Sequence, residues 1–209
     1  RSTLFPYTTL FRSASKEELQ AFICRVNEAG LCAIDTETTG LDPMRDDIVG
    51  MSISTETENI YVPINHISYI DHERVDNQLT RDEVKECLEQ LSRSTKLVWF
   101  NAVFDIRILW NHVGVRLWAD WDCSVASRIM NENEPDKGLK PLHAKYCPED
   151  EMSALSFSSI FDGISFEQVP ISVGYIYAAN DSRITLRVYH FQKKYLYYDP
   201  GEKPESRNG

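Results

Sequence analysis

One segment, LCAIDTET at residues 31–38, constrains the fold of this chain more than any other, because an apolar run there ends in two carboxylates. A run of this kind is typical of a central strand with both faces covered. Asp35 and Glu37 are two positions apart, so on a strand both side chains leave the same face. They repel each other unless a cation lies between them, and Mg²⁺ or Mn²⁺ takes such oxygen ligands. Acidic pairs near strand ends are more often simply solvated, so this pair alone does not establish a metal site.

Further strand patterns surround this segment. The runs IVGMSIST (48–55) and NIYVPINH (59–66) are joined by the polar triplet ETE, which predicts an antiparallel meander with 31–38. KLVWFN (96–101) and the short LWADWD (117–122) follow, each leading into a helical pattern. Three antiparallel strands and then alternating helices and strands predict an α/β fold with a mixed sheet flanked by helices. The ribonuclease H-like fold has this order.

Helical periodicity marks the remaining elements. Helices are predicted between Ser15 and Gly30, after Thr80, over 102–112, over about 123–132, and from 171 to about 196 in one or two pieces. Capping boxes begin the first two, because Glu stands three residues after Ser15 and after Thr80. Asn101 is expected to cap the helix at 102–112, and Gly114 to end it. The stretch 134–170, with four prolines, is expected to be irregular with one or two short helices.

Both ends of the chain differ from its middle. Residues 1–13, RSTLFPYTTLFRS, hold no acidic residue, and their codons can be written to resemble a sequencing-library adapter. We therefore expect a non-native segment from an environmental assembly, followed by one domain over 14–197. A native N-terminal extension is the alternative. Residues 198–209 are rich in turn residues and read as a polar tail or linker.

Composition narrows the class of protein. A hydrophobic share of 42% suits a globular domain, no apolar stretch is long enough for a membrane span, and we expect a cytoplasmic location. The net charge of −10 argues against a general nucleic-acid coat protein, but not against a metal-dependent nuclease. Five scattered cysteines without a CxxC motif are expected to be reduced core thiols.

Two later segments carry acidic residues to the same edge of the predicted sheet. Asp105 lies in the first turn of the helix that follows the strand at 96–101. Such a carboxylate can interact with the helix dipole and do nothing more. Tyr177 and Asp181 are four apart in a helical pattern and so share a face, although Tyr177 also suits a core position. Together the three segments suggest one metal site.

The chain resembles a known family in three motifs. IDTETTGLDP (34–43), NAVFD (101–105) and YAAND (177–181) are similar to the three exonuclease motifs of the DEDD superfamily. Tyrosine four residues before the last aspartate marks its tyrosine subclass, because the histidine subclass would have His at Ile176. LDPMRDDIVGMSIS, GLKPLHAKY, ALSFSSIF and VPISVGYIYAANDSRITLRVY look like the 3′→5′ proofreading domain of family-A DNA polymerases, especially phage types. The likeness covers roughly 15–197, and no polymerase module follows in this sequence.

The resemblance implies a two-metal hydrolysis with Mg²⁺ or Mn²⁺. Asp35, Glu37 and Asp181 would hold one cation, with Asp35 bridging to a second that Asp105 binds through water. Tyr177 would orient the attacking water, since a phenol with a pKa near 10 is a poor base. The products would be a nucleoside 5′-monophosphate and a shortened strand.

The implied substrate is a single-stranded or frayed DNA 3′ end. Thr38 and Leu41 would lie near the terminal nucleotide, with Leu41 wedged between bases, and Asn101 and Phe104 would contact its sugar or phosphate. For Leu41 and Phe104 a core position is a serious alternative. Three basic residues are candidates for phosphate contacts, but we expect them to be solvated surface groups; they are Lys140, Arg183 and Arg187.

Three other readings stay open or are disfavoured. An RNA exonuclease of the ribonuclease D type shares the motifs, but the 41–52 stretch and the lack of an added basic helical domain favour DNA. A non-catalytic scaffold beside a polymerase is disfavoured because all four carboxylates are present. A zinc site is disfavoured because the histidines lack ligand spacing with any cysteine; they are His66, His72, His112 and His143.

Overall fold

A single mixed sheet forms the centre of the molecule. The computed structural model describes residues 9–12, 15–150, 161 and 163–196, and in this part of the chain the sheet has six strands in the order β1-β4-β3-β2-β5-β6. They are β1 (Thr9–Arg12), β2 (Leu31–Thr38), β3 (Ile48–Ser54), β4 (Glu58–Pro63), β5 (Lys96–Trp99) and β6 (Trp121–Asp122). β2, β3 and β4 are antiparallel, and β5 runs parallel to β2 and β6 to β5, as predicted.

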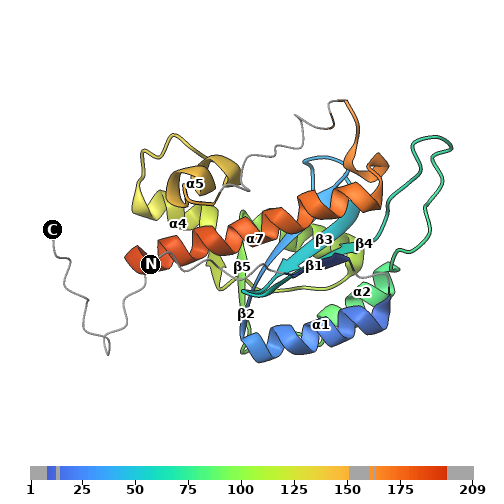
Figure 1. Ribbon diagram of the computed structural model, residues 1–209, viewed down its shortest axis with the longest axis horizontal. Helices are drawn as coiled ribbons and strands as arrows, with labels where there is room; N and C mark the ends of the chain where they lie inside the picture. Colours follow the sequence, from blue (N-terminus) through green and yellow to red (C-terminus); the bar gives the residue numbers. More distant parts are fainter. Residues whose placement is uncertain (1–8, 13–14, 151–160, 162, 197–209) are drawn as a thin grey trace.

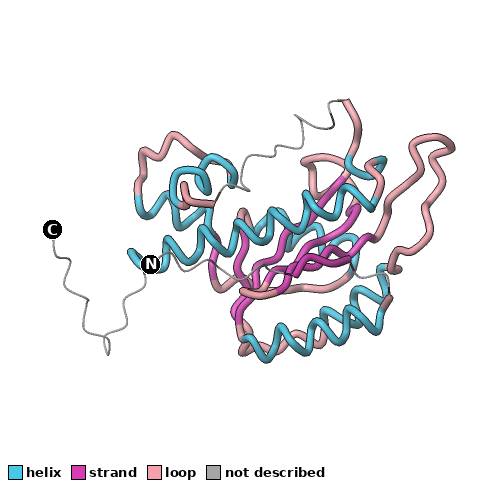
Figure 2. Tube along the Cα trace, viewed as in Figure 1, coloured by secondary structure: helices cyan, strands magenta, loops and turns pink. Residues whose placement is uncertain are grey.

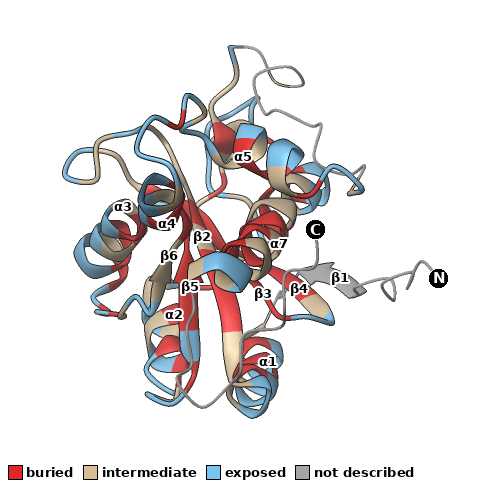
Figure 3. Cartoon of the chain, turned by 90° about the vertical axis from the view of Figure 1, so that its left-hand side faces the viewer, coloured by how far each residue is buried: buried red, intermediate tan, exposed pale blue. Residues whose placement is uncertain are grey.

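Two layers of helices cover the sheet (Figures 1 and 2). One layer holds α1 (Lys16–Ala29), α2 (Arg81–Leu88), α3 (Ala102–Ile108) and the π-helical turn η1 (Leu109–Val113). The other holds α4 (Cys123–Met130), α5 (Leu139–Tyr146) and the long α7 (Ile171–Leu196), which follows the short η3 (Phe166–Gln168). Both faces of the central strands are therefore buried, as Figure 3 shows. None of the described helices is long and apolar enough to cross a membrane.

Side chains of β2 alternate between these layers. Cys32 and Ile34 pack into the core with α1 and α2, whereas Ala33 packs with residues of α7. Because alternate side chains share a face, Asp35 and Glu37 continue the Ala33 face toward α7. This alternation sets the position of the functional site.

Helix boundaries agree with the predicted signals in most places. Gly30 and Gly114 both have the left-handed conformation that ends a helix, at φ 69° and 79°. Thr80 and Glu83 form the complete capping box. The last helix is one piece of 26 residues rather than two. The predicted helix at 102–112 turns into the π-helical η1 after Ile108.

The expected cap of α3 is right in position and wrong in its hydrogen bond. Asn101 stands at the N-cap position, but its φ of 67° is left-handed and its side chain makes no cap hydrogen bond. Asp122 of β6 replaces it, because its two carboxylate oxygens accept from the backbone N–H groups of Asn101 at 3.1 Å and Ala102 at 2.9 Å. A tertiary partner therefore satisfies the helix end that a local signal was expected to satisfy.

The sequence predicted no strand in the first thirteen residues, yet Thr9–Arg12 form the edge strand β1. It runs parallel to β4, with Thr9 opposite Glu58 and Arg12 opposite Tyr61. An open strand edge offers unpaired N–H and C=O groups and can take up an extended segment of any origin. The pairing therefore carries no information on whether these residues are native, and the non-native origin stays a prediction.

Candidate active site

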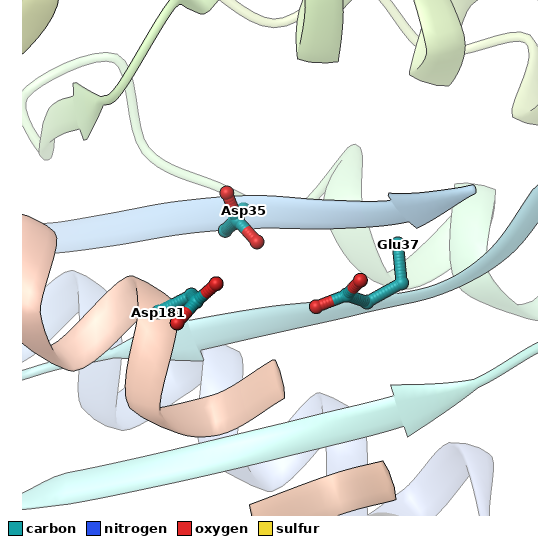
Figure 4. A group of neighbouring side chains, drawn as sticks. All are labelled: Asp35, Glu37 and Asp181. Carbon is teal, nitrogen blue, oxygen red and sulfur yellow. The ribbon is translucent and has the colours of Figure 1, made fainter. Parts of the chain in front are cut away.

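Three carboxylates from β2 and α7 converge on one space (Figure 4). Asp35 and Glu37 project from β2, and Asp181 projects from the middle of α7. Each offers an oxygen atom, and these oxygens all lie within 4.8 Å of one another. It is the one such group of three or more potential metal ligands among the described residues. The structure thus brings Asp35 and Glu37 close to Asp181, as the sequence predicted.

Burial and mutual repulsion make this group unfavourable on its own. Burial raises the pKa of Asp35 and of Glu37 well above the usual range, and the neighbouring carboxylates raise both further. Burial also raises the pKa of Asp181 to about 6, although Lys140 and Tyr177 oppose the rise. Perturbation of this kind is typical of functional sites.

The donor set fits a hard divalent cation. Glu37 Oε1 and Asp181 Oδ1 are buried, and neither accepts a hydrogen bond from the part of the chain that the structure describes. Buried carboxylate oxygens without a partner are costly, and a cation between them removes that cost. Since all donors are carboxylate oxygens, the arrangement suits Mg²⁺ or Mn²⁺ better than a soft metal.

Asp105 reaches the site from the opposite helical layer. Its Oδ1 accepts from the Thr36 backbone N–H at 3.0 Å and from the Thr36 hydroxyl at 2.6 Å. β5 pairs with β2 only as far as Ala33, so α3 places Asp105 where the ladder would otherwise continue. Burial raises the pKa of Asp105 to about 7 against these two hydrogen bonds. It lies outside the group of three, which is compatible with the predicted contact through water.

Tyr177 lies one helical turn before Asp181 and interacts with it. A hydrogen bond from the Tyr177 side chain lowers the pKa of Asp181. Lys140 of α5 donates to the Tyr177 hydroxyl at 2.5 Å, and its ammonium lies 3.9 Å from the centre of the Tyr177 ring. The tyrosine is therefore a member of the site and not only a core residue.

The expectation that the basic residues are solvated surface groups is wrong for two of them. The Lys140 side chain is 20% exposed and lies 3.3 Å from Asp181 Oδ2. The Arg183 side chain is 12% exposed and pairs with Asp150. Arg187 is half-buried. The sequence analysis named Lys140 but did not place it beside Asp181, because no local pattern shows that α5 packs against α7.

The predicted substrate residues have different surroundings. Leu41 is 92% exposed on the turn after β2, so the core alternative is wrong for it. Phe104 is partly buried and packs against the core beside α3. The Thr38 hydroxyl donates to the Gly40 carbonyl at 2.6 Å, and Asn101 is exposed. Their contacts with substrate remain predictions.

The histidines do not form a zinc site in the described structure. His66 Nε2 shares a hydrogen bond with the Tyr61 hydroxyl at 2.7 Å, and His112 lies 3.1 Å from Asp47. The five cysteines are free, with Cys24 exposed rather than in the core. The predicted core position is thus wrong for Cys24, and the reduced state stays a prediction.

Comparison with known proteins shows the family of the chain. A family model described as 3′–5′ exonuclease matches residues 12–196. DNA polymerase I of Pseudomonas aeruginosa is 32% identical over 179 residues, which are 81% of this chain and 19% of that protein. The chain therefore spans about a fifth of that relative.

Solved structures show the same fold at low identity. Trypanosoma brucei RNase D superposes with a TM-score of 0.66 and 12% identity, covering 90% of this chain and 65% of its own. Brucella melitensis NrnC with bound Mg²⁺ gives a TM-score of 0.58 and 19% identity, covering 90% and 82%. These likenesses confirm the ribonuclease H-like α/β fold. Because the family model matches far more than half of it, the chain belongs to the 3′–5′ exonuclease family.

Proposed function

We propose that this domain removes nucleoside 5′-monophosphates from DNA 3′ ends with two divalent cations, as the proofreading module of a family-A DNA polymerase. The observation that carries the proposal is the convergence of Asp35, Glu37 and Asp181, with two buried oxygens that accept no hydrogen bond from the described residues. A bacterial or phage-infected cytoplasm is the proposed setting. The identity with DNA polymerase I supports DNA as the substrate.

The four carboxylates and Tyr177 would have different roles in the reaction. Asp35, Glu37 and Asp181 would hold the first cation, and Asp35 and Asp105 the second. When bound, the cations would activate water and stabilise the leaving oxygen. The Tyr177 hydroxyl, which already hydrogen-bonds Asp181, would orient the attacking water. The Mg²⁺ bound by Brucella melitensis NrnC supports magnesium as one suitable ion.

The substrate end would lie beside the turn that follows β2. Leu41 projects into solvent there, which suits a wedge between the last bases. Phe104 presents a partly buried ring at the start of α3, and stacking on such a ring tolerates any base. Thr38 and Asn101 would contact the terminal nucleotide with polar groups.

Loss of one carboxylate tests the proposal directly. Asp35→Ala removes the ligand that both cations would share, so Mg²⁺-dependent digestion of 5′-labelled single-stranded DNA is expected to fall below detection on a gel. Asp82→Ala is the matched control, because Asp82 is exposed on α2 in the opposite layer. Circular dichroism checks that both variants fold. Retained digestion by a folded Asp35→Ala variant would sink the assignment.

The RNA alternative has the fold of RNase D in its favour, but a likeness at 12% identity shows fold alone. Matched DNA and RNA strands, and DNA with a single 2′-hydroxyl at its 3′ end, separate the two. We expect faster digestion of DNA with Mg²⁺ or Mn²⁺ and none with EDTA. A preference for RNA ends would overturn the proofreading role while leaving the metal site intact.

A further inference from the structure

A lysine lies inside the carboxylate group described above. Lys140 is in the first turn of α5, and its ammonium is 3.3 Å from Asp181 Oδ2 and 2.5 Å from the Tyr177 hydroxyl oxygen. Only 20% of its side chain is exposed. An ammonium has three donors and no acceptor, so Tyr177 accepts from Lys140 and its own proton is free for Asp181.

The position of this lysine is built into the packing of α5 on α7. Arg183, two residues after Asp181, donates to both carboxylate oxygens of Asp150 at 2.6 and 3.2 Å. The same Asp150 lies 3.3 Å from Nε2 of His143, which is fully buried on α5. This bidentate pair and the buried histidine fix α5 against α7 and so hold Lys140 near the carboxylates.

The charge of Lys140 acts on the whole group. It opposes the rise in the pKa of Asp35, Glu37 and Asp181, so its field reaches all three carboxylates. The two oxygens of Asp181 differ, because Oδ2 lies near the ammonium whereas Oδ1 is buried without a hydrogen bond from the described residues. A divalent cation and the ammonium would therefore interact with the same carboxylates.

We propose that Lys140 is a positioning residue that serves as the counter-cation of the metal-free site and competes with the divalent ion for Asp181. This rests on the proposed metal site. Without metal, the ammonium compensates repulsion among the carboxylates and keeps α7 and β2 together. When a metal ion binds, the charge of Lys140 repels it. Lys140 therefore lowers the metal affinity of the site while it stabilises the metal-free state.

The test compares Lys140→Met with Lys140→Arg, which keeps the charge, and with Lys137→Met, which removes an exposed lysine three residues away. Thermal unfolding is measured in EDTA and Mn²⁺ binding by calorimetry. Lys140→Met is expected to lower the melting temperature in EDTA yet to bind Mn²⁺ on the order of tenfold more tightly, because the repulsion is gone. The two control variants are expected to behave like the wild type.

A merely structural role predicts the same loss of stability but weaker Mn²⁺ binding, since a loosened site loses stability and metal affinity together. Unchanged or weaker Mn²⁺ binding by Lys140→Met would therefore overturn the inference. The Asp181→Asn background gives a second readout in EDTA, where the effect of Lys140→Met is expected to shrink. An undiminished effect would also overturn it. A wild type that binds no Mn²⁺ would refute the proposed metal site. The melting temperatures in EDTA would still test whether Lys140 stabilises the protein through Asp181.

Discussion

Each carboxylate of the site has a different neighbour, and these neighbours decide how it behaves. Asp35 and Glu37 face each other and Asp181, whereas Asp105 is fixed by Thr36 from the other layer. Thr36 stands between the two strand carboxylates and points away from them. Thr36 of β2 thus positions Asp105, the carboxylate that α3 contributes.

Replacement of Thr36 tests this arrangement. Thr36→Val keeps the shape and the backbone N–H but removes the hydroxyl that donates to Asp105 at 2.6 Å. Because hydrogen bonds to charged groups contribute about 1.5–3 kcal/mol, we expect a loss of that order in the free energy of unfolding, measured with urea. The exonuclease rate is expected to fall as well. Thr36→Ser retains the hydroxyl and should stay near the wild type; an equal loss in both variants would contradict the account.

The raised pKa values predict an unusual pH dependence. Folding raises the pKa of Asp181 from 3.8 to about 6 and that of Asp105 to about 7, so the folded state binds more protons than the unfolded state between these values. The contribution of these two carboxyl groups to stability without metal therefore falls as pH rises from about 4 to about 7, whereas the lowered pKa of buried His66 acts in the opposite direction. A bound cation favours the ionised carboxylates and is expected to remove this fall.

Melting temperatures between about pH 5 and about pH 8, in EDTA and in Mg²⁺, provide the measurement. The Asp105→Asn variant is the control, because it should show a smaller decline in EDTA. A melting temperature in EDTA that rises over this interval would show that the carboxylates are not the dominant titrating groups.

The limits of sequence analysis are clear at the residue scale. Asp35, Glu37, Tyr177 and Asp181 could be predicted together because strand and helix periods fix which neighbours share a face. Lys140 could not, because its contact depends on how α5 docks, and that docking depends on Asp150, a residue outside every motif. Local periods carry no information about such tertiary contacts.

At the scale of elements, a glycine allows β4 to pack beside the site. Gly50 of β3 is opposite Glu37, and the ring of Tyr61 from β4 crosses over it. A Cβ at Gly50 would lie 2.1 Å from the Tyr61 hydroxyl oxygen. Tyr61 cannot move aside easily, because it is fully buried and its hydroxyl is hydrogen-bonded to His66.

We therefore expect Gly50→Ala to destabilise the fold by about 3 kcal/mol or more, at or beyond the upper end of ordinary overpacking. It should also disturb Glu37 and lower the exonuclease rate. Gly138→Ala is the matched control, since the nearest atom to its new Cβ would be Pro141 Cδ at 3.4 Å. Chemical unfolding of both variants gives the comparison, and equal stabilities would show that Tyr61 repacks without cost.

Element order was predictable, but element continuity was not. Strand and helix patterns gave the mixed sheet and both layers. The sequence left open whether the last helix is one piece or two, and α7 is continuous through Gly174, which packs close to Phe166 and Val169. The cap of α3 comes from Asp122 of β6, a partner twenty-one residues away from Asn101, so no local pattern could reveal it.

For the molecule as a whole, the site depends on β2, β5 and α7, and the edge strand β1 lies beyond β4 and β3. Removal of residues 1–13 is therefore expected to leave the exonuclease rate unchanged and to lower the melting temperature only slightly, because a four-residue edge strand adds little. Activity assays and thermal unfolding of the shortened chain check this. A large loss of stability would indicate that β1 is an integral part of the natural fold.

The alternation along β2 has a consequence for how such domains can diverge. An insertion of one residue before Asp35 would turn both carboxylates toward α1 and α2 and bring a neutral side chain to face α7. A substitution in the strand changes one side chain, but a change of its length by one residue moves every later side chain to the opposite face. Among descendants of a common ancestor, insertions and deletions should therefore accumulate in the turn 39–47 and be rare in 31–38. The strand should keep its length even where its apolar residues have been replaced by other apolar residues.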